Sequence, residues 1–85
     1  MPEIEIGKVV HYFDKISVAA VSITDGELRI GDTIRIKGHT SDISTQIDSM
    51  QVEHQSVSVA KKGDDVGIKV PGRVRVNDAV YKVIA

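Results

Sequence analysis

Apolar and polar side chains alternate at every second position along most of this chain. Ile34 and Ile36 alternate with Arg35 and Lys37, and the apolar residues of segment 66–70 follow the same spacing. An alternation with a period of two is typical of a strand that buries one face. An apolar spacing suited to an amphipathic helix is nowhere sustained over three turns. The pattern therefore predicts a protein built of strands.

Glycine, aspartate and proline interrupt this alternation and divide the chain into short strands. Shorter apolar pieces at 28–30 and 74–76 lead into two of the predicted turns. The expected strands cover approximately residues 5–12, 16–24, 33–37, 43–54, 57–59, 66–70 and 79–84. About seven short strands with a turn every 8 to 12 residues are typical of an all-β barrel or sandwich. We expect a small closed antiparallel β-barrel of about six to eight strands, because closure hides sheet edges from other chains.

Two of the expected strands have irregular apolar patterns. Residues 16–24 carry apolar side chains on both faces, which predicts a central strand. Within residues 43–54 the apolar positions change from odd to even numbers, which predicts a bulge near Asp48 and Ser49. Gly67 lies inside a strand pattern and predicts either a bulge or a close approach of the backbone.

Glycine–aspartate pairs mark the predicted corners of the fold. Gly31 and Gly63 stand where the chain reverses, and such positions often need the positive φ that glycine adopts without steric cost. Asp32, Asp64 and Asp78 follow in these turns, where an aspartate side chain accepts hydrogen bonds from backbone N–H groups. We therefore predict a structural role for the three carboxylates.

The composition bounds the size and the chemistry of the protein. The 85 residues, 41% hydrophobic and 27% charged, correspond to one globular domain spanning residues 1–85. Valine and isoleucine must build the core, and we expect the scarce aromatic residues, Tyr12, Phe13 and Tyr81, to help fill it. There is no apolar run long enough to span a bilayer and no basic, apolar leader at the start. We expect a cytoplasmic protein without membrane contact.

The sequence contains no catalytic or metal-binding motif. The absence of cysteine excludes disulfides and thiolate ligands, and the three histidines lack the spacing of a metal site. There is no phosphate-binding loop and no Gly-x-Ser-x-Gly elbow, so we expect no nucleotide hydrolysis and no nucleophilic catalysis. The sequence predicts a non-enzymatic protein without metal or cofactor.

Basic residues lie on the outward positions of several strands. Arg35 and Lys37 share one strand face, Arg73 and Arg75 share another, and Lys69 points away from its apolar neighbours. If the barrel brings these strands together, they form a cationic face for RNA or an acidic protein. The net charge of −1 favours the alternative, which is an ordinary solvated surface.

The order of these motifs resembles domain II of elongation factor Tu and its relatives. A Gly-x-Val strand opens the chain at Gly7, a Leu-x-Ile-Gly-Asp-x-Ile-x-Ile hairpin covers residues 28–36, and a Gly-Asp-Asp-Val-Gly turn covers residues 63–67. A final Asp-Ala-Val-Tyr strand starts at Asp78. The resemblance covers nearly the whole chain and implies the barrel fold of that domain.

The resemblance also implies a ligand site. In elongation factor Tu the matching turn lies by the aminoacyl end and terminal adenosine of tRNA, which implies contacts from Asp64, Asp65, Val66 and Gly67. Asp65 stands where that factor has an asparagine. Residues 16–20 replace the glycine-rich strand that lines the other side of that pocket.

Two functional hypotheses follow from the resemblance. The first is a non-catalytic binding module of the translation apparatus, with tRNA, the ribosome or a translation factor as partner. The alternative is a protein-interaction or substrate-presenting barrel, because a related barrel closes some collagenase-like peptidases of bacteria. Pairing of two copies through uncapped sheet edges is a further expectation for so small a domain.

Overall fold

The alternating segments form antiparallel strands in the computed structural model, which describes residues 2–39 and 42–84. No helix of these residues is long and apolar enough to cross a bilayer. The strands are β1 (Glu3–Phe13), β2 (Val18–Ile23), β3 (Glu27–Arg29), β4 (Thr33–Lys37), β5 (Asp42–Gln46), β6 (Met50–Val52), β7 (Gln55–Val57), β8 (Val59–Lys61), β9 (Asp65–Lys69) and β10 (Ala79–Val83).

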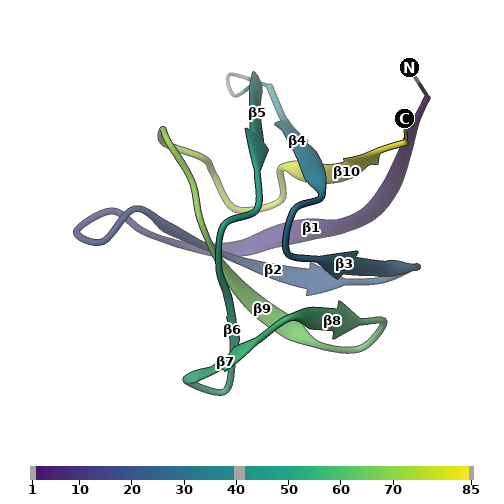
Figure 1. Cartoon of the computed structure of the whole chain (residues 1–85). Coiled ribbons are helices and arrows are strands. Elements are labelled where there is room, and N and C mark those ends of the chain that lie inside the picture. Colours follow the sequence, from purple (N-terminus) through teal and green to yellow (C-terminus); the bar gives the residue numbers. More distant parts are fainter. Residues whose placement is uncertain (1, 40–41, 85) are drawn as a thin grey trace.

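Eight of these strands form one bent sheet in the order β5-β4-β10-β1-β2-β9-β6-β7, and β3 pairs with β8 in a second, two-stranded sheet (Figure 1). The predicted all-β antiparallel fold is confirmed. The predicted central position of residues 16–24 is also confirmed, since β2 lies between β1 and β9. The strands are more numerous than expected because two of the predicted ones are each divided in two and because the short piece before Gly31 forms β3.

The large sheet does not close on itself through a continuous ladder, because β5 and β7 form its two edges. The two sides are joined by the small sheet, since β3 leads into β4 and β8 follows β7. The backbone N–H of Gly31 donates to the carbonyl of Ile47, and the N–H of Ile47 donates to the carbonyl of Asp32, both at 2.8 Å. These contacts take the place of the closed ladder expected from the sequence.

The inner faces of both sheets meet in one core of aliphatic side chains. Ile34 and Ile36 of β4 are fully buried while Arg35 and Lys37 point outward, as the alternation predicts. Burying branched aliphatic side chains stabilises the fold by about 1.5–3 kcal/mol each. The buried apolar residues are Ile6, Val9, Ala19, Val21, Ile23, Leu28, Ile34, Ile36, Ile47, Met50, Ala60, Val66, Ile68, Val70, Val74 and Val80.

The predicted long strand over residues 43–54 is wrong. The chain leaves the β4 ladder after β5, and buried Ile47 bonds to the β3–β4 turn before β6 joins β9. The change of apolar phase therefore marks a break between two strands and not a bulge. His54 lies beyond β6, because Glu53 and His54 form a tight turn to β7 with φ values of 51° and 65°.

Three turns share one hydrogen-bond pattern, which confirms the predicted role of the aspartates. In each turn the backbone N–H of the first residue donates to Oδ2 of the aspartate three positions later, at 2.9 Å. The aspartate N–H donates back to the carbonyl of the first residue, at 2.9–3.1 Å. The third residue has positive φ, 96° at Gly31, 93° at Gly63 and 76° at Asn77. The turns cover residues 29–32, 61–64 and 75–78.

Candidate functional site

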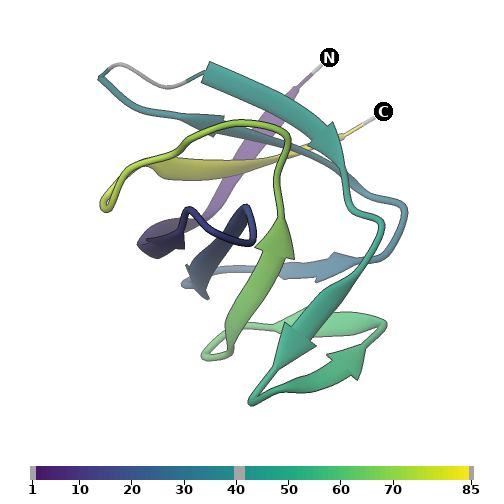
Figure 2. The same ribbon diagram turned by 90° about the vertical axis from the view of Figure 1, so that its left-hand side faces the viewer.

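A groove of about 430 Å³ lies against the outer faces of β2, β9 and β6. Figure 2 shows β9 between the β1–β2 turn and the β6–β7 turn, which border the groove on two sides. A volume of this size lies within the range of about 300–1,000 Å³ typical of ligand pockets. The groove is lined by Phe13, Ile16, Val18, Ala20, Gln51, Glu53, His54, Asp65, Val66 and Gly67.

The floor of the groove is made by small residues on adjacent strands. Ala20 of β2 pairs in register with Gly67 of β9, and Gly67 pairs in turn with Gln51 of β6. Neither ladder shifts its register at Gly67, so no bulge forms there. A β-carbon on Gly67 would lie 3.3 Å from the side-chain Cγ1 of Val18 and 3.8 Å from the backbone carbonyl oxygen of Gln51, so the tight neighbour is a side chain and not the predicted backbone.

One wall of the groove is an apolar turn at the end of β1. Phe13 is 46% exposed and Ile16 is 61% exposed. The backbone N–H of Ile16 donates to the carbonyl of Phe13 at 3.3 Å, and the carbonyl of Ser17 accepts the N–H of Val70 at 2.9 Å. These bonds fix the turn against the end of β9, so its apolar side chains are held out over the floor.

The opposite side of the groove carries the polar groups. Glu53 and His54 come from the β6–β7 turn, and Asp65 opens β9. The ten lining residues include two carboxylates and no lysine or arginine. Neither Glu53 nor Asp65 takes part in an ion pair within the described part of the chain. The groove is thus apolar on its floor and negatively charged at one end.

The structure gathers three of the site residues expected from the sequence. Asp65, Val66 and Gly67 all line the groove, although Val66 points its side chain into the core. Asp64 lies just outside it, where its carboxylate accepts the backbone N–H of Lys61 and its carbonyl accepts the N–H of Ile23 at 3.0 Å.

Arg35 is engaged in ion pairs on the outer face of β4. Its Nε and Nη2 atoms each lie 2.8 Å from a carboxylate oxygen of Asp42, and Nη1 lies 3.3 Å from Oε2 of Glu3. The hydrogen bond from Arg35 lowers the pKa of Asp42, and the pKa of Arg35 is raised by Asp42 and Glu3. The charge of Arg35 is therefore already balanced by its neighbours.

The other expected cations lie at separate places. Lys37 is on β4 and Lys69 on β9, with β10, β1 and β2 between these strands. Arg73 and Arg75 lie on the connection from β9 to β10, and Nη2 of Arg73 lies 3.8 Å from Oδ2 of Asp14. The sheet order does not bring the strand cations together.

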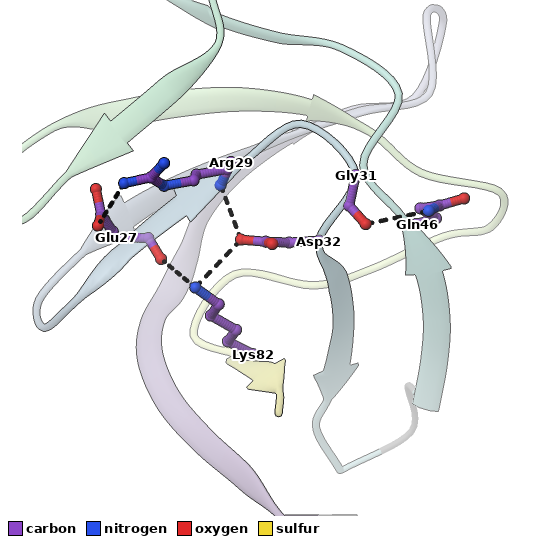
Figure 3. Close-up of polar contacts among 6 residues, drawn as sticks. All are labelled: Glu27, Arg29, Gly31, Asp32, Gln46 and Lys82. Atoms are coloured by element: carbon purple, nitrogen blue, oxygen red, sulfur yellow. Dashed lines mark hydrogen bonds and ion pairs between the residues drawn. The ribbon is translucent and has the colours of Figure 1, made fainter. Parts of the chain in front are cut away.

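A polar cluster that the sequence did not indicate lies where the chain passes from the small sheet to the large one. Nζ of Lys82 lies 3.3 Å from Oδ2 of Asp32 and 3.4 Å from the carbonyl of Glu27, and Nε2 of Gln46 donates to the carbonyl of Gly31 (Figure 3). The Lys82 side chain is only 25% exposed. Its acceptors belong to strand β3 and to the turn that follows it, so the cluster fixes the corner before β4 and presents no free nucleophile.

The groove residues missed at the sequence level are Phe13 and Ile16. Phe13 was expected in the core, but β1 shifts register between Val9 and His11 and carries Phe13 beyond it, where its ring packs edge-on against His11. The sequence offered one signal for these two residues, which is that they are apolar and stand on either side of a turn.

In residues 2–39 and 42–84, no group of three histidine, aspartate or glutamate side chains is placed to hold a metal ion.

Comparison with known protein families gives a match over most of the chain. The family described as elongation factor Tu domain 2 matches residues 17–80. Among curated proteins, an uncharacterized protease of Methanocaldococcus jannaschii is 45% identical over 80 residues, and a collagenase of Porphyromonas gingivalis is 38% identical over 81 residues. These matches cover 93% and 94% of this chain but 19% and 20% of the relatives. The chain spans about a fifth of the length of the curated relatives it matches.

Solved structures share the same fold. The C-terminal domain of a Geobacillus thermoleovorans protein assigned to the U32 peptidases superposes with a TM-score of 0.86 at 19% identity, covering 94% of this chain and 92% of that domain. GDP-bound aIF5B from Aeropyrum pernix superposes with a TM-score of 0.74 at 20% identity, covering 99% of this chain and 17% of that protein. At these identities the likeness concerns the fold alone.

Proposed function

This chain belongs to the elongation factor Tu domain 2 family, and within that family we propose that it is a non-catalytic module that binds polypeptide. In this proposal it acts as a protein-interaction or substrate-presenting barrel, similar to the segment that it matches in the protease and collagenase relatives. Because the matched segment is only about a fifth of those relatives, their catalytic activity is not transferred to this chain.

The observation that carries the proposal is the groove with its exposed apolar turn. Phe13 and Ile16 are large, solvent-exposed and held in place by backbone hydrogen bonds. Exposed aromatic and aliphatic side chains beside a concave surface are typical anchors of protein interfaces. Burying a side chain of about leucine size in such a groove gains roughly 1.5–3 kcal/mol.

The chemistry of the groove supports binding over catalysis. Its lining provides His54 and two carboxylates, but no serine, threonine, cysteine or lysine that could act as a nucleophile. Nucleophilic catalysis needs a nucleophile within hydrogen-bond reach of a base, together with donors for the developing charge. The groove lining supplies a possible base, His54, but none of these nucleophiles.

The proposal is tested by titrating the purified chain with fluorescently labelled gelatin fragments. The variants F13A and I16D should each weaken binding at least about tenfold, because each removes an apolar anchor. The matched control is I30D, since Ile30 is also exposed, at 47%, but does not line the groove. Binding that is absent in the wild-type chain, or that I30D weakens equally, would contradict a peptide-binding groove.

A role in translation is the second candidate, favoured by the family itself and by the fold of aIF5B. In this reading the turn before β9 contacts tRNA or the ribosome. The two groove carboxylates oppose that reading, because phosphate binding depends on lysine and arginine. Co-sedimentation with ribosomes and tRNA across a salt series tests it, and binding that survives about 0.15 M salt would favour it over the first candidate.

A further inference from the structure

We propose that the groove selects a positively charged segment of polypeptide, in which an apolar side chain is followed or preceded by lysine or arginine. This inference rests on the proposed peptide-binding function and specifies its ligand. The apolar side chain lies on the floor over Ala20 and Gly67, and the cation lies at the end of the groove formed by Glu53 and Asp65.

Both carboxylates line the groove, and both are free to accept a cation. Asp65 opens β9, where the next residue, Val66, pairs with Val52, and Val52 directly precedes Glu53. Neither carboxylate makes an ion pair or a side-chain hydrogen bond in the part of the chain that the structure describes. By contrast, Asp32, Asp64 and Asp78 are all engaged in turns.

The outer face of β9 also carries opposite charges at its two ends. Asp65, Gly67 and Lys69 alternate on the outer face of β9, with Asp65 at the acidic end and Lys69 in register with Val18 at the other. A ligand cation is attracted to the first end and repelled from the second. Glu53 and Asp65 are exposed, so a single ligand charge changes the affinity only moderately, but its sign sets the direction of binding.

The same charges disfavour a nucleic acid. A terminal adenosine could stack on Phe13, but its phosphate would then lie near Glu53 or Asp65 with no lysine or arginine in the groove lining. Affinity for a nucleic-acid backbone comes mainly from cations that neutralise phosphates. The polypeptide reading therefore agrees with both the apolar floor and the acidic end, whereas the nucleic-acid reading agrees with the floor only.

The experiment measures fluorescence anisotropy of the intact chain with three labelled peptides. The peptides share a Leu-Phe core and differ only in the flanking residue, which is lysine, glutamine or glutamate. We expect affinity to fall in that order, with about a tenfold difference between the lysine and glutamate peptides at low salt that shrinks at 0.5 M salt or so. In the double variant E53Q/D65N the preference for the lysine peptide over the glutamate peptide should be lost.

The matched control is D25N, because Asp25 is exposed on the β2–β3 turn and does not line the groove. The D25N variant should keep the wild-type order of affinities. If all three peptides bind the wild-type chain equally, charge selection is wrong while the proposed binding function stands. If none binds, both are wrong. Tighter binding of a labelled single-stranded RNA than of the lysine peptide would also overturn the proposal.

Discussion

A β-carbon on Gly38 would overlap the carboxylate of Asp78, which is the one buried charged side chain among the described residues. The carboxylate accepts the backbone N–H of Arg75 at 2.9 Å, and the Asp78 carbonyl accepts the N–H of Val9 at 2.8 Å. The end of β4, the third aspartate turn and β1 therefore meet at one point. The close approach of Gly38 leaves no room for another side chain there.

The variant G38A should lower the free energy of unfolding by about 1–3 kcal/mol, because an added methyl in a filled site forces neighbouring atoms apart. Urea denaturation of the purified protein measures this change. The control is G31A, where a β-carbon meets nothing within 4 Å and only the positive φ is unfavourable. A G38A variant as stable as the wild type would mean that the carboxylate of Asp78 moves aside freely.

The variant D78A should destabilise more than D64A, although both aspartates make the same turn. Removing either carboxylate leaves a backbone N–H without its acceptor, but only Asp78 is buried, so water cannot replace the lost bond there. We expect losses of about 2–3 kcal/mol for D78A and about 1 kcal/mol for D64A, read from denaturant midpoints. Equal losses would show that burial does not matter at this turn.

The variant H54G should stabilise the protein. Both turn residues, Glu53 and His54, have positive φ in a two-residue hairpin, where glycine is the favoured second residue. Relief of this strain should raise the unfolding free energy by about 0.5–1 kcal/mol. Placing glycine one position later, as Q55G in strand β7, should instead lower it. Thermal denaturation of the two variants separates a turn effect from a general effect of glycine.

Stability should depend on pH through Asp42. Its pKa is lowered by the hydrogen bond from Arg35, so its ionised form is favoured by folding. The contribution is therefore fully present above the ordinary aspartate value of about 3.8 and is lost as the pH falls below it. The variant D42N should show a smaller loss of stability over that acidic range than the wild type.

Urea titrations at several pH values below 5 or so give the comparison for D42N. The variant D25N serves as control, because Asp25 makes no ion pair among the described residues. The Arg35–Asp42 pair joins β4 to β5 on the outer surface, so 1 M salt or thereabouts should reduce the difference. A pH dependence that is the same in D42N and wild type would contradict a stabilising Arg35–Asp42 pair.

Local features of the fold were predictable because they depend on neighbouring residues. The alternation of Ile34 and Ile36 with charged residues indicates β4, and Gly31 with Asp32 indicates its first turn. The break at Ile47 was not predictable in this way. Its cause is a pair of hydrogen bonds to the β3–β4 turn, which is distant in the sequence.

The candidate site was predictable only in part. Resemblance to a known family pointed to Asp65 and Gly67, which do line the groove. The exposed Phe13 was expected in the core, because the register shift in β1 cannot be read from the alternation. The acidic end was missed because Glu53 and Asp65 are brought to the same groove only by the pairing of β6 with β9.

The most direct test of the account is a two-dimensional amide NMR titration of the chain with the lysine-flanked Leu-Phe peptide. We predict that the changes in chemical shift concentrate at Ile16, Ala20 and Gly67 and spare Arg35 and Arg73. Shifts concentrated around Arg73 and Arg75, or no shifts at saturating peptide, would contradict a polypeptide-binding groove beside β9.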